Sequence, residues 1–401
     1  MKYTKQEVMQ FVDEEDVKFI RLAFCDVFGK QKNISIMPSE LERAFTQGVA
    51  IDASAVKGFG GEADSDLFLH PDPDTLSVLP WRPEHGRVVR MYCTITRPDG
   101  TVFDRDTRSL LIRAVEAAKQ AGVQFRFGSE IDFYLVRLDE NGEPTNVPYD
   151  NAGYMDIAPQ DKGENVRREI CLALEQMGIH PEASHHEEGP GQNEINFRAS
   201  DPLTAADDAQ TFMTVVRAIA ARNGLWADFS PKPLGDKPGS GFHINVSVTG
   251  TDGVPSPAFI AGILERIEPL TVFLNPVPAS YRRLGRCKAP GYVSWGERNR
   301  SLLIRVPAAF GAYRRAELRS ADPSANPYLA FALLIYAGLD GISRAAKLPA
   351  PAEINFYTAS EEARAAFRKL PGSLEEAVEK AKDDPFLRTC LPASLIEAYC
   401  G

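Results

Sequence analysis

VQFRFGSEIDFYLVRL, residues 123–138, decides how the larger part of this chain folds. Its many β-branched and aromatic residues predict one long strand. Because strand side chains point to alternate faces, Glu130 and Asp132 share one face while Ile131 and Phe133 lie on the other. The segment therefore predicts a sheet with one apolar face and one face that carries carboxylates.

Helical and strand patterns alternate on both sides of this segment, so the fold class is α+β. The helices are predicted over residues 108–122, 164–177, 203–222, 257–273, 328–346 and 361–382. Further strands are predicted over residues 241–249, 301–307 and 314–320. Thr107 is the expected N-cap of the first of these helices, and Gly122 is its expected end.

The first hundred residues form a smaller, β-rich segment. Residues 17–24 and 88–96 are predicted strands, and Ser39 is the expected N-cap of a short helix through Phe45. The turn formed by Pro98, Asp99 and Gly100 marks a domain boundary. The predicted domains are residues 1–100 and 101–401.

Composition and charge exclude several classes of protein. The 401 residues are 44% hydrophobic and 25% charged, with a formal net charge of -10, which disfavours binding to nucleic acid or to an anionic membrane. The polar N-terminus lacks an apolar signal core, and no apolar stretch is long enough to cross a bilayer. Six scattered cysteines without a CxxC pair indicate reduced thiols. We expect a cytoplasmic protein without nucleic-acid or membrane partners.

Other predicted strands repeat the spacing of polar residues seen at residues 130 and 132. The repeats are Glu194, Asn196 and Arg198; His243, Asn245 and Ser247; and Arg315, Glu317 and Arg319. Any one polar strand face usually lies in water, but ionised carboxylates side by side repel and need a compensating cation. An oxygen-rich set with one imidazole suits two or three Mg²⁺ or Mn²⁺ ions. The candidate metal ligands are Glu130, Asp132, Glu187, Glu194, His243 and Glu317.

The second half of the chain contains, besides the candidate ligands His243 and Glu317, five arginines: Arg283, Arg300, Arg305, Arg315 and Arg319. Arginine binds carboxylate and phosphate groups through two parallel hydrogen bonds. Hard metal ions beside arginines are suited to phosphoryl transfer from a nucleotide. The sequence has no GxxxxGK[ST] loop, so the nucleotide would be held in another way.

The chain resembles the glutamine synthetase family, type I, over nearly its whole length. The resemblance is carried by ordered motifs: IDASAVKGF (51–59), SDLFLHPDPDT (65–75), GSEIDFYL (128–135), HHEEGPGQNEI (185–195), PKPLGDKPGSGFHINVS (231–247), NPVPASYRRL (275–284), APGYVSWGERNRSLLIRVP (289–307) and RRAELRSADPSANPYLAFALL (314–334). It implies an N-terminal β-grasp domain and a catalytic domain with a curved antiparallel sheet flanked by helices. It also implies a homo-oligomer, a hexameric ring or a dodecamer, with active sites between subunits.

The resemblance also implies a role for each site residue. Asp132, Glu187 and Glu194 match ligands of the metal that organises glutamate, and Glu130, His243 and Glu317 match ligands of the metal on ATP. Arg283 and Arg319 match contacts to glutamate and phosphate, and Gly239 lies in the glutamate-binding loop. The nucleotide-side positions are Asn245, Ser247, Arg300, Arg305 and Arg315. Tyr154 and, from a neighbouring subunit, Asp52 match the ammonium pocket.

The family reaction implied is transfer of the γ-phosphoryl group of ATP to glutamate, followed by attack of ammonia on γ-glutamyl phosphate. The chain departs from the family on the side of the nucleophile. Lys288 stands where the family usually has a Glu before Ala-Pro, in a loop one residue shorter. Ala55 lacks a hydroxyl found in the ammonium pocket, and Asp132 is one methylene shorter than the usual Glu.

Three hypotheses follow from this pattern. The first is a glutamine synthetase that uses ammonia. The second is a γ-glutamyl ligase that uses another amine, such as an alkylamine, a polyamine or an amino acid whose carboxylate could pair with Lys288. The third is a catalytically silent structural or regulatory member, which ranks last because all six metal positions keep side chains that can bind metal.

Overall fold

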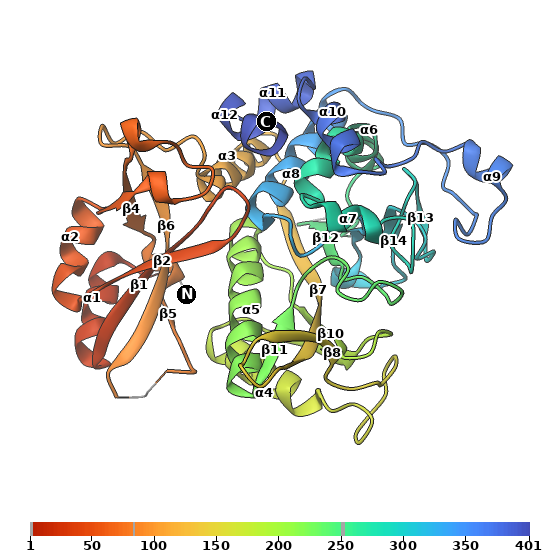
Figure 1. Ribbon diagram of the computed structural model, residues 1–401. Coiled ribbons are helices and arrows are strands. Elements are labelled where there is room, and N and C mark those ends of the chain that lie inside the picture. Colours follow the sequence, from red (N-terminus) through yellow and green to blue (C-terminus); the bar gives the residue numbers. More distant parts are fainter. Residues whose placement is uncertain (1–2, 83–84, 250–252) are drawn as a thin grey trace.

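The computed structural model describes residues 3–82, 85–249 and 253–401 (Figure 1). A six-stranded sheet near the N-terminus has the order β2-β1-β6-β4-β3, with β5 paired to β6. Its strands are β1 (Val17–Cys25), β2 (Gln31–Ile36), β3 (Val49–Asp52), β4 (Asp66–Pro71), β5 (Ser77–Val78) and β6 (Arg87–Thr96). The central pair, β1 and β6, is parallel, and the other pairs are antiparallel. This is the β-grasp domain that the motifs predict.

Two helices lie on the outer side of this sheet, α1 (Lys5–Glu14) and α2 (Leu41–Thr46) (Figure 1). The N-terminus of α1 is closed by a capping box between Thr4 and Glu7. The expected capping role of Ser39 is wrong. Ser39 lies inside a 3₁₀ turn that Pro38 begins, because the fixed φ of proline favours the first position of a helical turn.

The larger, nine-stranded sheet has the order β13-β14-β15-β12-β7-β10-β9, and β8 and β11 also pair with β7. Its strands are β7 (Phe125–Leu138), β8 (Pro144–Pro148), β9 (Pro181–His186), β10 (Gln192–Phe197), β11 (Leu225–Asp228), β12 (Phe242–Val248), β13 (Trp295–Glu297), β14 (Ile304–Val306) and β15 (Ala316–Leu318). Only β13 and β14 are parallel among the described pairs. The predicted strand at 123–138 is confirmed as β7, the centre of the sheet.

Long helices cover the apolar face of this sheet (Figure 1). The helices of the larger domain are α3 (Thr107–Gln120), α4 (Glu164–Gln176), α5 (Pro202–Arg222), α6 (Pro257–Leu274), α7 (Pro278–Arg283), α8 (Pro327–Ser343), α9 (Glu361–Ala365), α10 (Leu374–Ala381), α11 (Pro385–Cys390) and α12 (Ala393–Cys400). Phe127 of β7 stacks on Phe331 of α8 at 4.5 Å between ring centroids, and Phe133 packs edge-on against Phe212 of α5. Since these odd-numbered residues face the helices, the even-numbered Glu130 and Asp132 face away from the core.

Helices α6 and α8 cross closely because glycines meet at the crossing. A Cβ atom on Gly341 would lie 2.2 Å from the carbonyl oxygen of Ala258 and 2.6 Å from the Cα atom of Gly262. Glycine is therefore required there for the backbones to approach. The crossing holds α8, which supports the middle of the sheet, in place.

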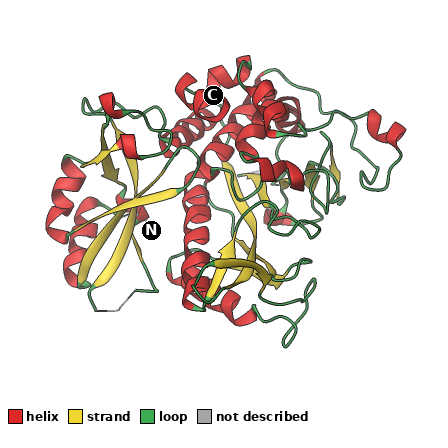
Figure 2. Ribbon diagram, in the orientation of Figure 1, coloured by secondary structure: helices red, strands yellow, loops and turns green. Residues whose placement is uncertain are grey.

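Three predictions about local structure need correction. Asp106, not Thr107, caps α3, because its carboxylate accepts the N–H of Arg108. The helix predicted at 361–382 is two helices, α9 and α10. Helix α9 ends at Ala365, the backbone of residues 368–370 then pairs with residues 291–293, and Pro371 and Gly372 precede a new start that Ser373 caps. The strands predicted at 301–307 and 314–320 shrink to three residues each, and loops make up much of the chain on that side of the sheet (Figure 2).

The domain boundary at residue 100 stays a prediction. In the described parts of the chain, every helix is too short or too polar to span a bilayer.

Candidate active site

Strand register places the candidate metal ligands directly opposite one another. Glu194 on β10 lies opposite Asp132 on β7 and opposite His185 on β9. Two residues before Asp132, Glu130 lies opposite His243 on β12. Directly opposed residues on one face of a sheet have Cβ atoms about 4.5–5.5 Å apart. Four strands thus assemble a carboxylate-rich surface from segments far apart in sequence.

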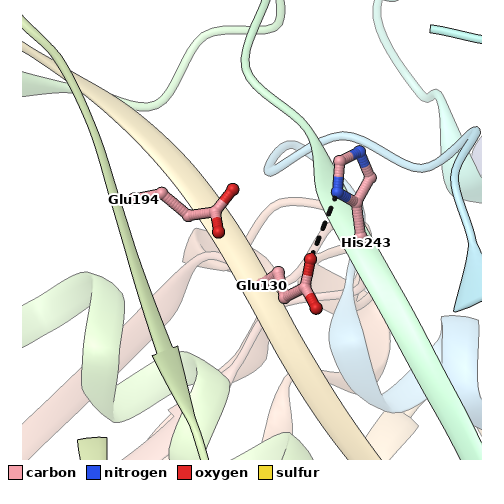
Figure 3. Close-up of side chains that lie close together, drawn as sticks. All are labelled: Glu130, Glu194 and His243. Carbon is pink, nitrogen blue, oxygen red and sulfur yellow. Dashed lines mark ion pairs between the residues drawn. The ribbon is translucent and has the colours of Figure 1, made fainter. Parts of the chain in front are cut away.

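The close-up shows Glu130, Glu194 and His243 turned toward a common space (Figure 3). One ligand atom from each of these residues lies within 4.8 Å of the others. The Nδ1 atom of His243 is 3.7 Å from Oε2 of Glu130. A second group of the same kind joins His185, Glu187 and Glu194, so Glu194 belongs to both.

The electrostatics of this surface fit divalent cations. Burial raises the pKa of Glu194 to about 7, and the negative charges of Glu130 and Glu187 add to the effect. Burial, together with Glu194 and Glu187, raises the pKa of Asp132 well above its usual value. Carboxylates that repel one another in this way are stabilised in the ionised form by a cation. The oxygen-rich donor set suits Mg²⁺ or Mn²⁺.

The pKa of Glu130 is lowered, in contrast to those of Glu194 and Asp132. Burial works against its ionisation, but His243, the amide of Asn245 and the guanidinium of Arg315 outweigh it and lower the pKa of Glu130 to about 2. Asn245 donates to Glu130 at 2.9 Å and accepts from Nε of Arg315 at 2.7 Å. Glu130 is thus held ionised by neighbours on β12 and at the start of β15.

Glu317 is fully buried between two arginines. It forms an ion pair with Arg305 at 2.7 Å and a second ion pair with Arg319. Its Oε1 atom lies 3.6 Å from Nδ1 of His243. The structure therefore brings Glu317 beside the candidate metal ligands, with both carboxylate oxygens occupied by arginine.

A cavity of about 290 Å³ opens over this surface. The candidate residues that line it are Asp132, Tyr154, Glu187, Glu194, Gly239, His243, Arg283, Lys288, Arg300 and Arg319. A Cβ atom on Gly239 would lie 2.4 Å from the carbonyl oxygen of Pro231 and 2.8 Å from the side chain of Arg283. Only glycine fits there without displacing Arg283, whose guanidinium donates to the carbonyl oxygens of Ser320 and Arg319.

Seven candidates lie outside the described lining of this cavity. Five of them contact one another or His243: Glu130, Asn245, Arg305, Arg315 and Glu317. The other two, Asp52 and Ser247, lie apart from these contacts. Asp52 ends β3 in the other sheet, where its carboxylate accepts from the backbone N–H and the hydroxyl of Ser54. Ser247 lies on β12 opposite Arg126, beyond Asn245. Arg198, which shares the polar spacing of β10, has a side chain that is 69% exposed and lies near Glu182.

Glu188, and the contact between His186 and Asp150 behind the cavity, were not predicted from the sequence. Glu188 lines the cavity and forms an ion pair with Lys288. Behind it, the buried His186 contacts Asp150 at 2.9 Å, and Asp150 also accepts the N–H of Gly191. The signal for Glu188 was the doubled Glu in HHEEG, but its partner lies a hundred residues away in the chain.

Comparison with known proteins identifies the family to which the chain belongs. The profile described as "Glutamine synthetase, catalytic domain" matches residues 104–401, and that described as "Glutamine synthetase, beta-Grasp domain" matches residues 16–98. The chain belongs to the glutamine synthetase family. It is an ATP-dependent ligase that acts on glutamate, as family membership and the retained site together indicate.

Curated relatives named glutamine synthetase cover almost the whole chain. One from Clostridium saccharobutylicum is 44% identical over 97% of this chain and 92% of its own length. One from Staphylococcus aureus is 41% identical over 97% of this chain and 91% of its own length.

Two solved structures share the fold. The structure described as "GmaS/ADP complex-Conformation 1" has a TM-score of 0.88 and 27% identity, and covers 98% of this chain and 93% of that chain. The structure described as "Apo GmaS without ligand" has a TM-score of 0.87 and 28% identity, with the same coverage. The family uses ATP and divalent metal ions.

Proposed function

We propose that the chain joins ammonia to the γ-carboxylate of L-glutamate through γ-glutamyl phosphate. The observation that carries the proposal is the convergence of Asp132, Glu187, Glu194 and His243 with Arg283 and Arg319 on one cavity. Carboxylates there suit divalent ions, and arginines suit the carboxylate of glutamate and the transferred phosphoryl group. Positioning and charge neutralisation supply most of the catalysis of phosphoryl transfer.

The ions proposed are two or three Mg²⁺ or Mn²⁺. Asp132, Glu187 and Glu194 would hold an ion on the side of glutamate, and Glu130, His243 and Glu317 would hold an ion on the side of the nucleotide. Glu317 would do so through Oε1, which faces His243 and is shared with Arg319. Bound ions would neutralise charge on the phosphates. Arg300, Arg305 and Arg315, with Asn245 and Ser247, form the proposed nucleotide side.

The proposed substrate side places glutamate against Arg283, Arg319 and the loop that contains Gly239. Arg283 and Arg319 are both buried, so their charges are little screened by water. Lys288 and Tyr154 line the part of the cavity proposed for the incoming amine. The positive charge of Lys288 is proposed to influence which amine binds there.

We further propose a homo-oligomer, as a hexameric ring or a dodecamer, in the cytoplasm. Asp52 lies in the other sheet and outside the described lining of its own cavity, and it is proposed to approach the cavity of a neighbouring subunit. All six cysteines are free thiols, which fits a reducing compartment.

A second candidate is a γ-glutamyl ligase for another amine, such as an alkylamine, a polyamine or an amino acid. Lys288 favours the amino acid among these, because its ammonium group lines the cavity and could pair with the carboxylate of such an acceptor. The catalytically silent alternative ranks last, since the candidate metal ligands lie close together and all have side chains that can bind a metal ion.

An amine panel separates these functions. Phosphate release from ATP is measured with glutamate, Mg²⁺ or Mn²⁺, and ammonia, methylamine, ethanolamine, putrescine or amino acids in turn. The proposal expects release that needs glutamate, metal and amine together, with ammonia accepted. Preference for another amine selects the second candidate. No release with any amine, and no binding of a phosphorylated glutamate analogue, would leave the silent alternative.

A further inference from the structure

Two loops face each other across the acceptor side of the cavity. Glu188 lies in the turn between β9 and β10, and Lys288 lies in the loop between α7 and β13. Both residues line the cavity, and Nζ of Lys288 forms an ion pair with Oε1 of Glu188. The two side chains are 44% and 38% exposed, so water reaches this contact.

The same Nζ atom also lies over an aromatic ring. It is 5.5 Å from the ring centroid of Tyr154, which lines the same cavity. A carboxylate on one side and an aromatic face on the other form a recognition site for a positively charged amine. The Nζ atom of Lys288 belongs to a primary ammonium group. Its position, between the Glu188 carboxylate and the Tyr154 ring, is therefore where a substrate ammonium group would bind.

The backbone of this loop indicates that its conformation is held against strain. Cys287 and Lys288 both have positive φ angles, 45° and 66°. The left-handed region is unfavourable for residues other than glycine, and here two follow one another.

We propose that Glu188 and the ring of Tyr154 recognise the cationic acceptor amine, and that Lys288 occupies this site until the acceptor displaces it. The proposal deepens the proposed function and rests on it. The carboxylate that binds the amine would then lie in the turn between β9 and β10. The family usually has such a carboxylate on the opposite wall, in the loop that contains Lys288. The ligand class is ammonium or a small primary alkylammonium ion.

A site that recognises positive charge distinguishes charged from uncharged acceptors. An ammonium ion needs the carboxylate of Glu188, whereas a nucleophile that is uncharged at neutral pH does not. Hydroxylamine is largely uncharged at neutral pH and is a good nucleophile. It is therefore the matched control acceptor for ammonia or for the alkylamine that the panel identifies.

The main test is Glu188→Gln, which keeps the shape of the side chain and removes its charge. We expect the KM for the cationic amine to rise at least tenfold, while the KM values for glutamate and ATP stay within twofold. The KM for hydroxylamine should also stay within twofold. A change that is equal for both acceptors would show a merely structural role and would overturn the proposal.

The second test is Lys288→Met, which removes the resident ammonium and keeps most of the side-chain length. We expect the KM for the cationic amine to fall severalfold. A rise would show that the lysine belongs to the binding site and would overturn its role as an occupant. Lys382→Met and Glu379→Gln are matched controls, because Lys382 is also 44% exposed and pairs with Glu379 at 2.6 Å, outside the cavity.

The results also separate this inference from the proposed function. Absence of turnover by the wild-type chain with every amine and with hydroxylamine would overturn both. Wild-type turnover with an unchanged amine KM in Glu188→Gln would overturn the inference and leave the proposed function standing. Melting curves of each variant confirm that it is folded before its KM is compared.

Discussion

Glu194 on β10 lies directly opposite Asp132 on β7, and both carboxyl groups are buried. Burial and the neighbouring carboxylates raise the pKa of both groups, that of Glu194 to about 7. The apolar face of the same strands packs on helices, so the sheet fixes the backbone positions of the two residues next to each other. The fold thus holds two repelling carboxylates together at the place proposed for a metal ion.

Metal binding should therefore depend on pH in a defined direction. Below about pH 7 folded Glu194 keeps a proton that the unfolded chain loses near pH 4.5, so the metal-free protein loses stability as pH rises through this window. We expect Mg²⁺ or Mn²⁺ to raise the Tm more at about pH 8 than at about pH 6. In Glu194→Gln the metal-free Tm at about pH 8 should rise and the metal-induced shift should shrink. Equal metal-induced shifts in both proteins would contradict the site.

Asp208 of α5 provides a second pH test, away from the cavity. Burial raises its pKa to about 7, with a further contribution from the charge of Asp207. Since the folded state keeps a proton that the unfolded chain loses near pH 3.8, stability falls as pH rises from there to about 7. Asp208→Asn should stabilise the protein at about pH 8 by on the order of 2 kcal/mol, and little at about pH 4.

Chemical denaturation at the two pH values measures this difference. Glu175→Gln, at an exposed carboxylate on α4, is the control and should change stability equally little at both. If Asp208→Asn behaves like the control, the burial of Asp208 does not govern its ionisation.

The crossing of α6 and α8 should not accept a methyl group. Gly341→Ala would push Cβ into the backbone of α6 and should reduce the free energy of unfolding by about 1–3 kcal/mol. Gly235→Ala is the matched control, because no atom lies within 4 Å of the added Cβ. Thermal melts of the two variants check this, and equal Tm values would show that the helices can separate without cost.

Lys288→Glu should improve the use of ammonia. The substitution removes a resident cation and places a second carboxylate beside Glu188 and the ring of Tyr154. We expect the KM for ammonia to fall at least tenfold, with a change in stability of less than about 1 kcal/mol because the pair is exposed. Steady-state phosphate release measures it, and an unchanged KM would show that this loop does not touch the acceptor.

The sequence predicted the elements whose patterns are long. Strand β7 and helices α5, α6 and α8 carry many periodic apolar residues, and their existence and approximate bounds were confirmed. Short strands carry too little pattern for this: β13, three residues long, was not predicted, and β14 and β15 were predicted to be longer than they are. The break between α9 and α10 was missed because residues 368–370 leave the helix to pair with residues 291–293, a contact between segments distant in sequence.

The candidate site also contains parts that the sequence predicted and parts that it did not. The i, i+2 spacing placed Glu130 and Asp132 on one face, and the register then set them beside His243 and Glu194. The Glu188–Lys288 contact could not be predicted, because it joins two loops whose approach depends on the whole fold. Likewise, only coordinates show that both oxygens of Glu317 are taken by arginines.

Activation of the γ-carboxylate of glutamate is the central claim, and an oxygen-18 label tests it most directly. Glutamate labelled in its γ-carboxylate oxygens is incubated with ATP, metal ion and the accepted amine, and the released phosphate is analysed by mass spectrometry. The account predicts that each phosphate released carries one oxygen-18 atom from glutamate, only when amine is present. Unlabelled phosphate would show that water attacks ATP instead, and would contradict the assignment of this cavity to glutamate–amine ligation.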